Sequence, residues 1–134
     1  MPATINRINP AAVRAPSGYN HAIEIINPAR RVVIAGQVGV RPDGTIPDAT
    51  APGGAEAQIA QAFANLMAIL AATGMTTANL VKTTVFLTER AHLAAFRAER
   101  SKVMGDLVPA STLLFVAGLA DPRFVVEVEA EAVA

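Results

Sequence analysis

The chain has 134 residues, a length typical of one domain, and its eleven Lys and Arg residues balance eleven Asp and Glu residues. Hydrophobic residues make up 52% and charged residues 16%, which argues against intrinsic disorder and against a generally basic nucleic-acid-binding surface. The chain contains no Cys, which excludes disulfides, thiolate metal ligands and a Cys nucleophile.

Segments that would direct the chain to a membrane are not evident in the sequence. No apolar run reaches the roughly 20 residues that cross a bilayer, and the first residues lack the charged and apolar regions of a secretion signal. We therefore expect a cytoplasmic protein with a single domain over residues 1–134. The high apolar content further predicts that part of the surface is buried against another subunit.

The first part of the chain predicts strands that are separated by turn-rich loops. Residues 3–9 indicate a short strand, and two runs rich in β-branched residues, 21–27 and 30–40, indicate two more. The break between these runs, Asn27-Pro28-Ala29, is typical of a hairpin connection. Residues 41–54 contain three Pro and three Gly and are expected to form a loop.

From Ala55 onward the apolar residues recur at helical spacing, and Gly74 supplies a stop signal. The apolar positions of this helix are Ile59, Phe63, Leu66 and Leu70. The remaining predicted elements are a strand over 80–87, a helix over about 90–104, and strands over 111–116 and 124–133.

This order of elements predicts an α+β fold, in which one mixed sheet of about six strands carries two helices on one face. Both faces of the predicted strand 80–87 are fairly apolar. We therefore expect the face opposite the helices to be covered as well, by another copy of the chain.

Three glutamates, Glu127, Glu129 and Glu131, alternate with apolar residues in the last predicted strand. Like charges in a row repel unless they are solvated or paired, so the ordinary interpretation is a solvent-exposed face of the sheet. Acid–base catalysis would instead require a concave site around them. Lys82 is the expected neutralising neighbour if strands 80–87 and 124–133 pair.

Two arginines, Arg97 and Arg100, lie at the border of the apolar stripe of the second predicted helix. Two interpretations stay open. The guanidinium groups extend to water from the edge of the apolar face, or they form a receptor for a carboxylate or phosphate, whose oxygens match the fork geometry of Arg.

The other polar candidates also have two interpretations each. Ser111 either binds a ligand or is an ordinary residue at a strand start, and no GxSxG motif supports it as a nucleophile. Gly36 allows close approach of a ligand or marks a bulge. Tyr19, the only Tyr, caps a pocket or anchors its loop. His21 and His92 are expected to be structural, and the spacing of His, Asp and Glu indicates no metal site.

Four segments form a pattern in the order Gly36-Gln37-Val38, LVKTTVFLT (80–88), Pro109-Ala110 and VEVEAEAV (126–133). Together they resemble the RidA/YjgF family, the reactive-intermediate deaminases once labelled endoribonuclease L-PSP, over nearly the whole chain. The resemblance implies a chorismate-mutase-like protomer and a homotrimer with ligand clefts between subunits. It also implies that no cofactor is needed.

The best-known members of that family hydrolyse 2-imino acids to 2-keto acids and ammonia. In them, an Arg just after the Pro-Ala pair binds the substrate carboxylate, and a Glu farther along positions water. This chain has Ser111 in place of the Arg and Phe115 near the Glu, so it resembles a branch without the catalytic Arg. The resemblance places Tyr19, Ala35, Gly36, Arg97, Ser111 and Phe115 at ligand-contacting positions.

These residues predict a trimer that binds a small anionic metabolite and hydrolyses an imine or enamine unlike the simple 2-imino acids. A Ser hydroxyl cannot replace the charge of an Arg, so we expect Arg97 to bind the anion instead and Phe115 to make the cleft floor apolar. No catalytic residue is identified. The alternative is a non-catalytic trimer that senses or sequesters a metabolite. Both interpretations involve neither nucleic acid nor membrane, and neither needs a cofactor or metal.

Overall fold

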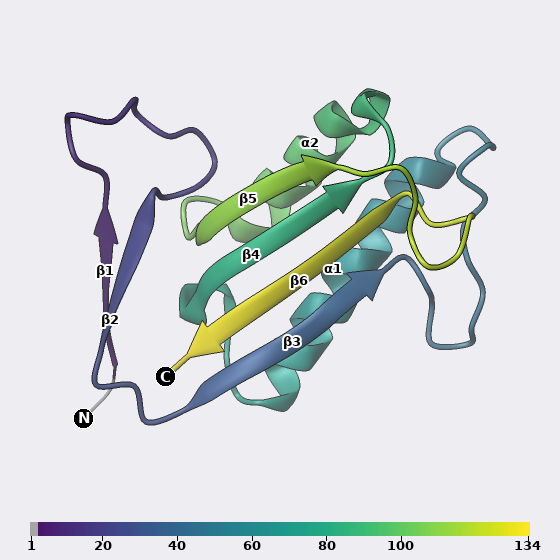
Figure 1. The fold of residues 1–134 in the computed structure, drawn as a ribbon. Helices are drawn as coiled ribbons and strands as arrows, with labels where there is room; N and C mark the ends of the chain where they lie inside the picture. Colours follow the sequence, from purple (N-terminus) through teal and green to yellow (C-terminus); the bar gives the residue numbers. More distant parts are fainter. Residues whose placement is uncertain (1–2) are drawn as a thin grey trace.

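A computed structural model describes residues 3–134 and confirms the predicted order of strands and helices. The elements are β1 (Thr4–Ile8), β2 (Ala22–Ile26), β3 (Arg31–Val38), α1 (Gly54–Ala72), η1 (Thr77–Asn79), β4 (Leu80–Leu87), η2 (Arg90–His92), α2 (Leu93–Met104), β5 (Ala110–Phe115) and β6 (Val126–Val133). Figure 1 shows α1 and α2 on the same face of the main sheet, as the sequence predicts.

The main sheet is mixed and has the strand order β3-β6-β4-β5. Strands β4 and β5 run parallel, whereas β6 is antiparallel to both of its neighbours. The two remaining strands, β1 and β2, form a separate antiparallel pair beside this sheet (Figure 1). The six predicted strands are therefore divided between two sheets, and a single bridge between Asn20 and Ala110 connects the pair to β5.

The predicted hairpin at Asn27-Pro28-Ala29 is wrong, because β2 pairs with β1 and β3 pairs with β6. Asn27 has a left-handed backbone (φ 53), so the chain turns sharply there. The amides of Ala29 and Arg30 then both donate to the carbonyl oxygen of Ala134, at 2.8 and 2.9 Å. These bonds attach the connection to the end of β6, which directs β3 along that strand.

The core lies between the sheet and the helices. The predicted apolar positions of α1 are confirmed, since Ile59, Phe63, Leu66 and Leu70 are all at most 1% exposed. Burying each of these side chains stabilises the fold by about 1.5–3 kcal/mol. By length and composition alone α1 could cross a membrane, but its apolar face is packed as that of a core helix.

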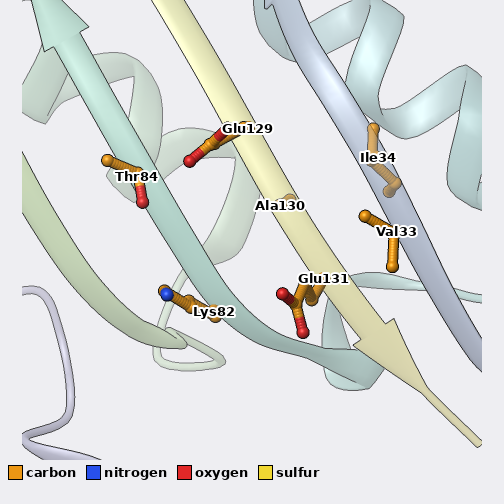
Figure 2. A pocket seen from close by; sticks show the side chains of 7 residues that line it. All are labelled: Val33, Ile34, Lys82, Thr84, Glu129, Ala130 and Glu131. Atoms are coloured by element: carbon orange, nitrogen blue, oxygen red, sulfur yellow. The ribbon is translucent and has the colours of Figure 1, made fainter.

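The sheet face opposite the helices carries the glutamate row. Figure 2 shows Glu129 and Glu131 of β6 beside Lys82 and Thr84 of β4 on this face. Lys82 lies opposite Glu131 in the strand register, and Arg31 of β3 forms an ion pair with Glu131 at 3.0 Å. These contacts favour the interpretation of Glu131 as part of a paired sheet face rather than of an acid–base centre.

A buried glutamine, which the sequence analysis did not single out, connects three segments at one end of α1. Gln58 is completely buried, and its Nε2 donates to the carbonyl oxygens of Pro47 and Arg123, each at 2.8 Å. Its Oε1 accepts from the amide of Val125 at 3.1 Å. This side chain therefore holds the loop before α1 against the segment that leads into β6.

The variant Gln58→Met is expected to lower the free energy of unfolding by roughly 2 kcal/mol, because it leaves the carbonyls of Pro47 and Arg123 and the amide of Val125 without this partner. The matched control is Gln61→Met, since the amide of Gln61 bonds to Asn65 on the same helix. Urea unfolding measures both variants. Equal stability of the two would contradict the assigned role of Gln58.

Candidate functional site

A cleft of about 280 Å³ lies between α2, β5 and the loop that precedes β2. Four of the six residues predicted to contact a ligand line it together, namely Tyr19, Arg97, Ser111 and Phe115. The other lining residues are Ser17, Leu93, Phe96, Arg100 and Leu113. The geometry thus gathers side chains from three separate segments around one concave surface.

One wall of the cleft is cationic. Arg97 and Arg100 lie three residues apart on α2, a spacing that puts both on the same side of the helix. Within residues 3–134, neither guanidinium forms an ion pair or a hydrogen bond. Burial, together with repulsion from Arg97, lowers the pKa of Arg100 below its ordinary value. An anion in the cleft would relieve this repulsion.

A glycine in the neighbouring loop determines where Arg100 lies. Gly18 has φ 76, and a Cβ atom built on it would overlap the guanidinium of Arg100. The guanidinium also lies 5.8 Å from the ring centroid of Phe96. The loop and the aromatic ring together hold Arg100 at the cleft.

The hydroxyl of Ser111 is oriented from the floor of the cleft. Thr83 of β4 lies opposite Ser111 in the parallel β4–β5 register and is 3% exposed. Its Oγ1 donates to the Ser111 Oγ at 2.9 Å. A hydroxyl has one donor and two acceptor sites, so Ser111 keeps further hydrogen-bonding capacity for a ligand.

The loop that carries Tyr19 is attached to the start of β5 by the next residue, Asn20. The Asn20 amide donates to the carbonyl oxygen of Pro109 at 3.0 Å, and its Nδ2 donates to that of Val108 at 2.7 Å. The Tyr19 ring meets the His21 ring edge-on at 5.3 Å, and His21 Nε2 lies 2.6 Å from the Arg14 carbonyl oxygen. These contacts make His21 a structural residue that supports Tyr19.

The other end of the cleft is apolar. Phe115 and Leu113 extend from β5 toward Leu93 of α2. The guanidinium of Arg90 lies 4.5 Å from the centroid of the Phe115 ring, a distance suited to a cation–π contact. The cleft therefore has a polar, cationic end and a hydrophobic end.

Ala35 and Gly36 lie elsewhere in the protomer. They belong to β3, which is separated from β5 by two strands of the sheet. The pairing of β3 with β6 shifts register between Ile34 and Gln37, which is the irregularity expected of a bulge. A Cβ atom on Gly36 would overlap the carboxylate of Glu127. Within one protomer Gly36 lies against Glu127, and neither Ala35 nor Gly36 lines the cleft.

Acidic side chains are absent from the cleft as far as residues 3–134 define it. Glu127 and Glu129 alternate with the buried Val126 and Val128, so their side chains point to the opposite face of the sheet. In the same part of the chain, no group of three His, Asp or Glu residues could hold a metal ion. One protomer thus offers cations and hydroxyls to a ligand, without a carboxylate for acid–base chemistry.

Sequence analysis missed the residues that position the cleft. Asn20 and Thr83 act through partners far away in the sequence, so no local motif marks them. Gly18 carried one usable signal, since glycine often marks a backbone that is left-handed or closely approached.

Comparison with known proteins agrees with the resemblance seen in the sequence. The family described as Endoribonuclease L-PSP matches residues 9–134. Protein HMF1 of Saccharomyces cerevisiae is 28% identical over 124 residues, which make up 92% of this chain and 88% of HMF1. The structure of YyfB from Yersinia pestis, a Rid family protein of unknown function, is 31% identical with a TM-score of 0.82, over 100% of both chains.

A third relative is RidA of an Antarctic Psychrobacter species, which is 28% identical with a TM-score of 0.70, over 90% of this chain and 91% of that protein. The fold of two helices on a mixed sheet is shared with these structures. The chain therefore belongs to the Endoribonuclease L-PSP family, also called the Rid/YjgF family.

The variant Asn20→Ala is expected to loosen the Tyr19 loop and to lower the free energy of unfolding by roughly 1–3 kcal/mol, because it leaves the Val108 carbonyl without its donor. Tyr19 is the only Tyr and the chain has no Trp, so tyrosine fluorescence anisotropy reports on this loop alone. The control is Asn6→Ala, which removes an exposed bond to Glu24 on the β1–β2 pair. Unchanged anisotropy and stability in Asn20→Ala would contradict the assignment.

Proposed function

We propose that the protein binds a small anionic metabolite in this cleft and hydrolyses an imine or enamine group of it. The observation that carries the proposal is Arg97, which forms no ion pair within residues 3–134 and shares one cleft with Tyr19 and Ser111. A guanidinium without a carboxylate partner is a strong receptor for an anionic oxygen group. Family membership supports the class of reaction.

In the family that the sequence resembles, an Arg at the position of Ser111 binds the anion. Here Arg97 on α2 supplies that positive charge instead. A ligand carboxylate at Arg97 can accept two parallel hydrogen bonds from the guanidinium. Ser111, whose oxygen already accepts from Thr83, can donate a further bond to the ligand. The carbon skeleton then extends toward Leu93 and Phe115, so the preferred ligand carries an apolar or aromatic group.

The proposed reaction requires water to be activated near the ligand. The water oxygen adds to the imine carbon, the C–N bond breaks, and the nitrogen leaves with the transferred protons as ammonia, so that a carbonyl group remains. An enamine first takes a proton at carbon and becomes the imine. A His or a carboxylate commonly performs such proton transfers, and the cleft of one protomer is lined by neither among residues 3–134.

We therefore propose that a homotrimer completes the cleft, with a neighbouring copy contributing the free edge of β3. This edge carries Ala35 and Gly36, and the carboxylate of Glu127 lies against Gly36. The arrangement would bring all six predicted ligand-contacting residues to one shared site. It would also bring a carboxylate into the shared site, where it could act on the attacking water.

A second function has support from the same geometry. Since the described cleft holds no carboxylate, the protein could bind a metabolite without transforming it, as a sensor or a sequestering protein. Release of ammonia distinguishes the two functions. The binding site itself is common to both.

The variant Arg97→Gln is expected to weaken binding of a probe such as phenylpyruvate by roughly tenfold or more, the loss of one charge-assisted contact. Isothermal titration calorimetry measures the affinity. The control variant is Arg7→Gln, which changes an exposed Arg on the β1–β2 pair. Equal affinities in Arg97→Gln and the wild type would remove Arg97 from the site.

Ammonia formation from imines tests the catalytic function directly. An amino-acid oxidase generates each imine in place, and the protein is expected to accelerate ammonia release more for apolar and aromatic side chains than for small uncharged ones. Arg97→Gln and Glu127→Gln are each expected to abolish most of this acceleration, and co-expression of the two variants should restore part of it if the site is shared between subunits. Carboxylate binding without acceleration for any amino acid would favour the non-catalytic function.

A further inference from the structure

We infer that Arg100 is a second anion-binding group and that the cleft selects ligands with two negative charges over ligands with one. The inference rests on the proposed function, because it concerns the ligand of the same cleft. It assigns a selecting role to a residue outside the six that the family resemblance places at ligand-contacting positions.

The position of Arg100 does not fit an arginine that simply extends from a helix into water. Its guanidinium lies against Gly18 and over Phe96, and it lines a small inner cavity together with Ser111 as well as the outer cleft. A half-buried cation loses hydration and needs a compensating anion. Within residues 3–134 no Asp or Glu provides one.

Two adjacent cations favour a ligand that carries two negative charges. Arg97 and Arg100 face the same cleft one helical turn apart, so one carboxylate neutralises only part of their combined charge. Ser17, Tyr19 and Ser111 add hydroxyl donors around the same space. These groups suit a dicarboxylate or a phosphate, which share two negative charges and several acceptor oxygens.

Calorimetric titration at constant ionic strength tests this selection with three probes. Succinate and butyrate have the same number of carbons and differ in the second carboxylate, and inorganic phosphate represents the other source of a double charge. For the wild type we expect at least one of the two dianions to bind roughly tenfold or more tightly than butyrate, as one added charge-assisted contact implies.

Two variants at this position keep the test independent of folding. Arg100→Gln is expected to remove the preference, so that the dianion and butyrate bind with affinities within about threefold of each other. Gly18→Ala retains the charge but displaces the guanidinium, so it should reduce the preference as well. Arg7→Gln should leave the preference intact, and thermal unfolding confirms that each variant is folded.

The outcomes separate this inference from the proposed function. Equal wild-type affinities for succinate, phosphate and butyrate would overturn the inference, and so would a preference that persists in Arg100→Gln. If either result is found but Arg97→Gln still weakens the binding of butyrate, the proposed function stands. If none of the three probes binds and Arg97→Gln changes nothing, the proposed function fails and the inference fails with it.

Discussion

Two guanidinium groups lie one turn apart on α2 without an acidic partner in the described chain, and the binding function proposed for the cleft depends on this unbalanced charge. Like charges one turn apart on a helix repel, and burial of Arg100 adds a loss of hydration. Such an arrangement lowers stability unless an anion occupies the space between the groups. It is therefore better explained by ligand binding than by a role in folding.

The surrounding fold keeps these charges in place. The parallel pairing of β4 with β5 brings Thr83 under Ser111, and the contacts of Asn20 carry Tyr19 to the same end of β5. The rings of Phe63 and Phe96 stack with their centroids 5.5 Å apart and connect α1 to α2. This contact fixes the helix that carries the two arginines against the core. The cleft is thus built from rigid elements and one short loop that is held by hydrogen bonds.

Periodicity and turn residues predicted most of the fold, because these signals are local. The apolar spacing of α1 and the alternation of β6 each depend on residues a few positions apart. The separate β1–β2 pair was not predictable in this way, since it depends on the left-handed turn at Asn27 and on bonds to the distant Ala134. A run of β-branched residues indicates that a strand forms, but it does not indicate which strand it pairs with.

The candidate site was predictable to the extent that side-chain chemistry is visible in the sequence. The apolar helical stripe singled out Arg97 and Arg100 together, and the family resemblance favoured Arg97. The supporting residues, Thr83 and Asn20, act through pairing with β5 and therefore became evident only in three dimensions. Gly36 matched a family pattern, yet its place on β3 gives it a role at the cleft only if a second copy of the chain is adjacent.

The most direct test of this account is the free energy of unfolding of Arg97→Gln, measured by urea without ligand at low ionic strength. Relief of repulsion on Arg100 is predicted to leave the variant as stable as the wild type or more stable by roughly 0.2–0.5 kcal/mol, and added salt should reduce the difference. A loss of more than about 1 kcal/mol would show that Arg97 stabilises the fold. That result would contradict the view that its charge is kept for an anionic ligand.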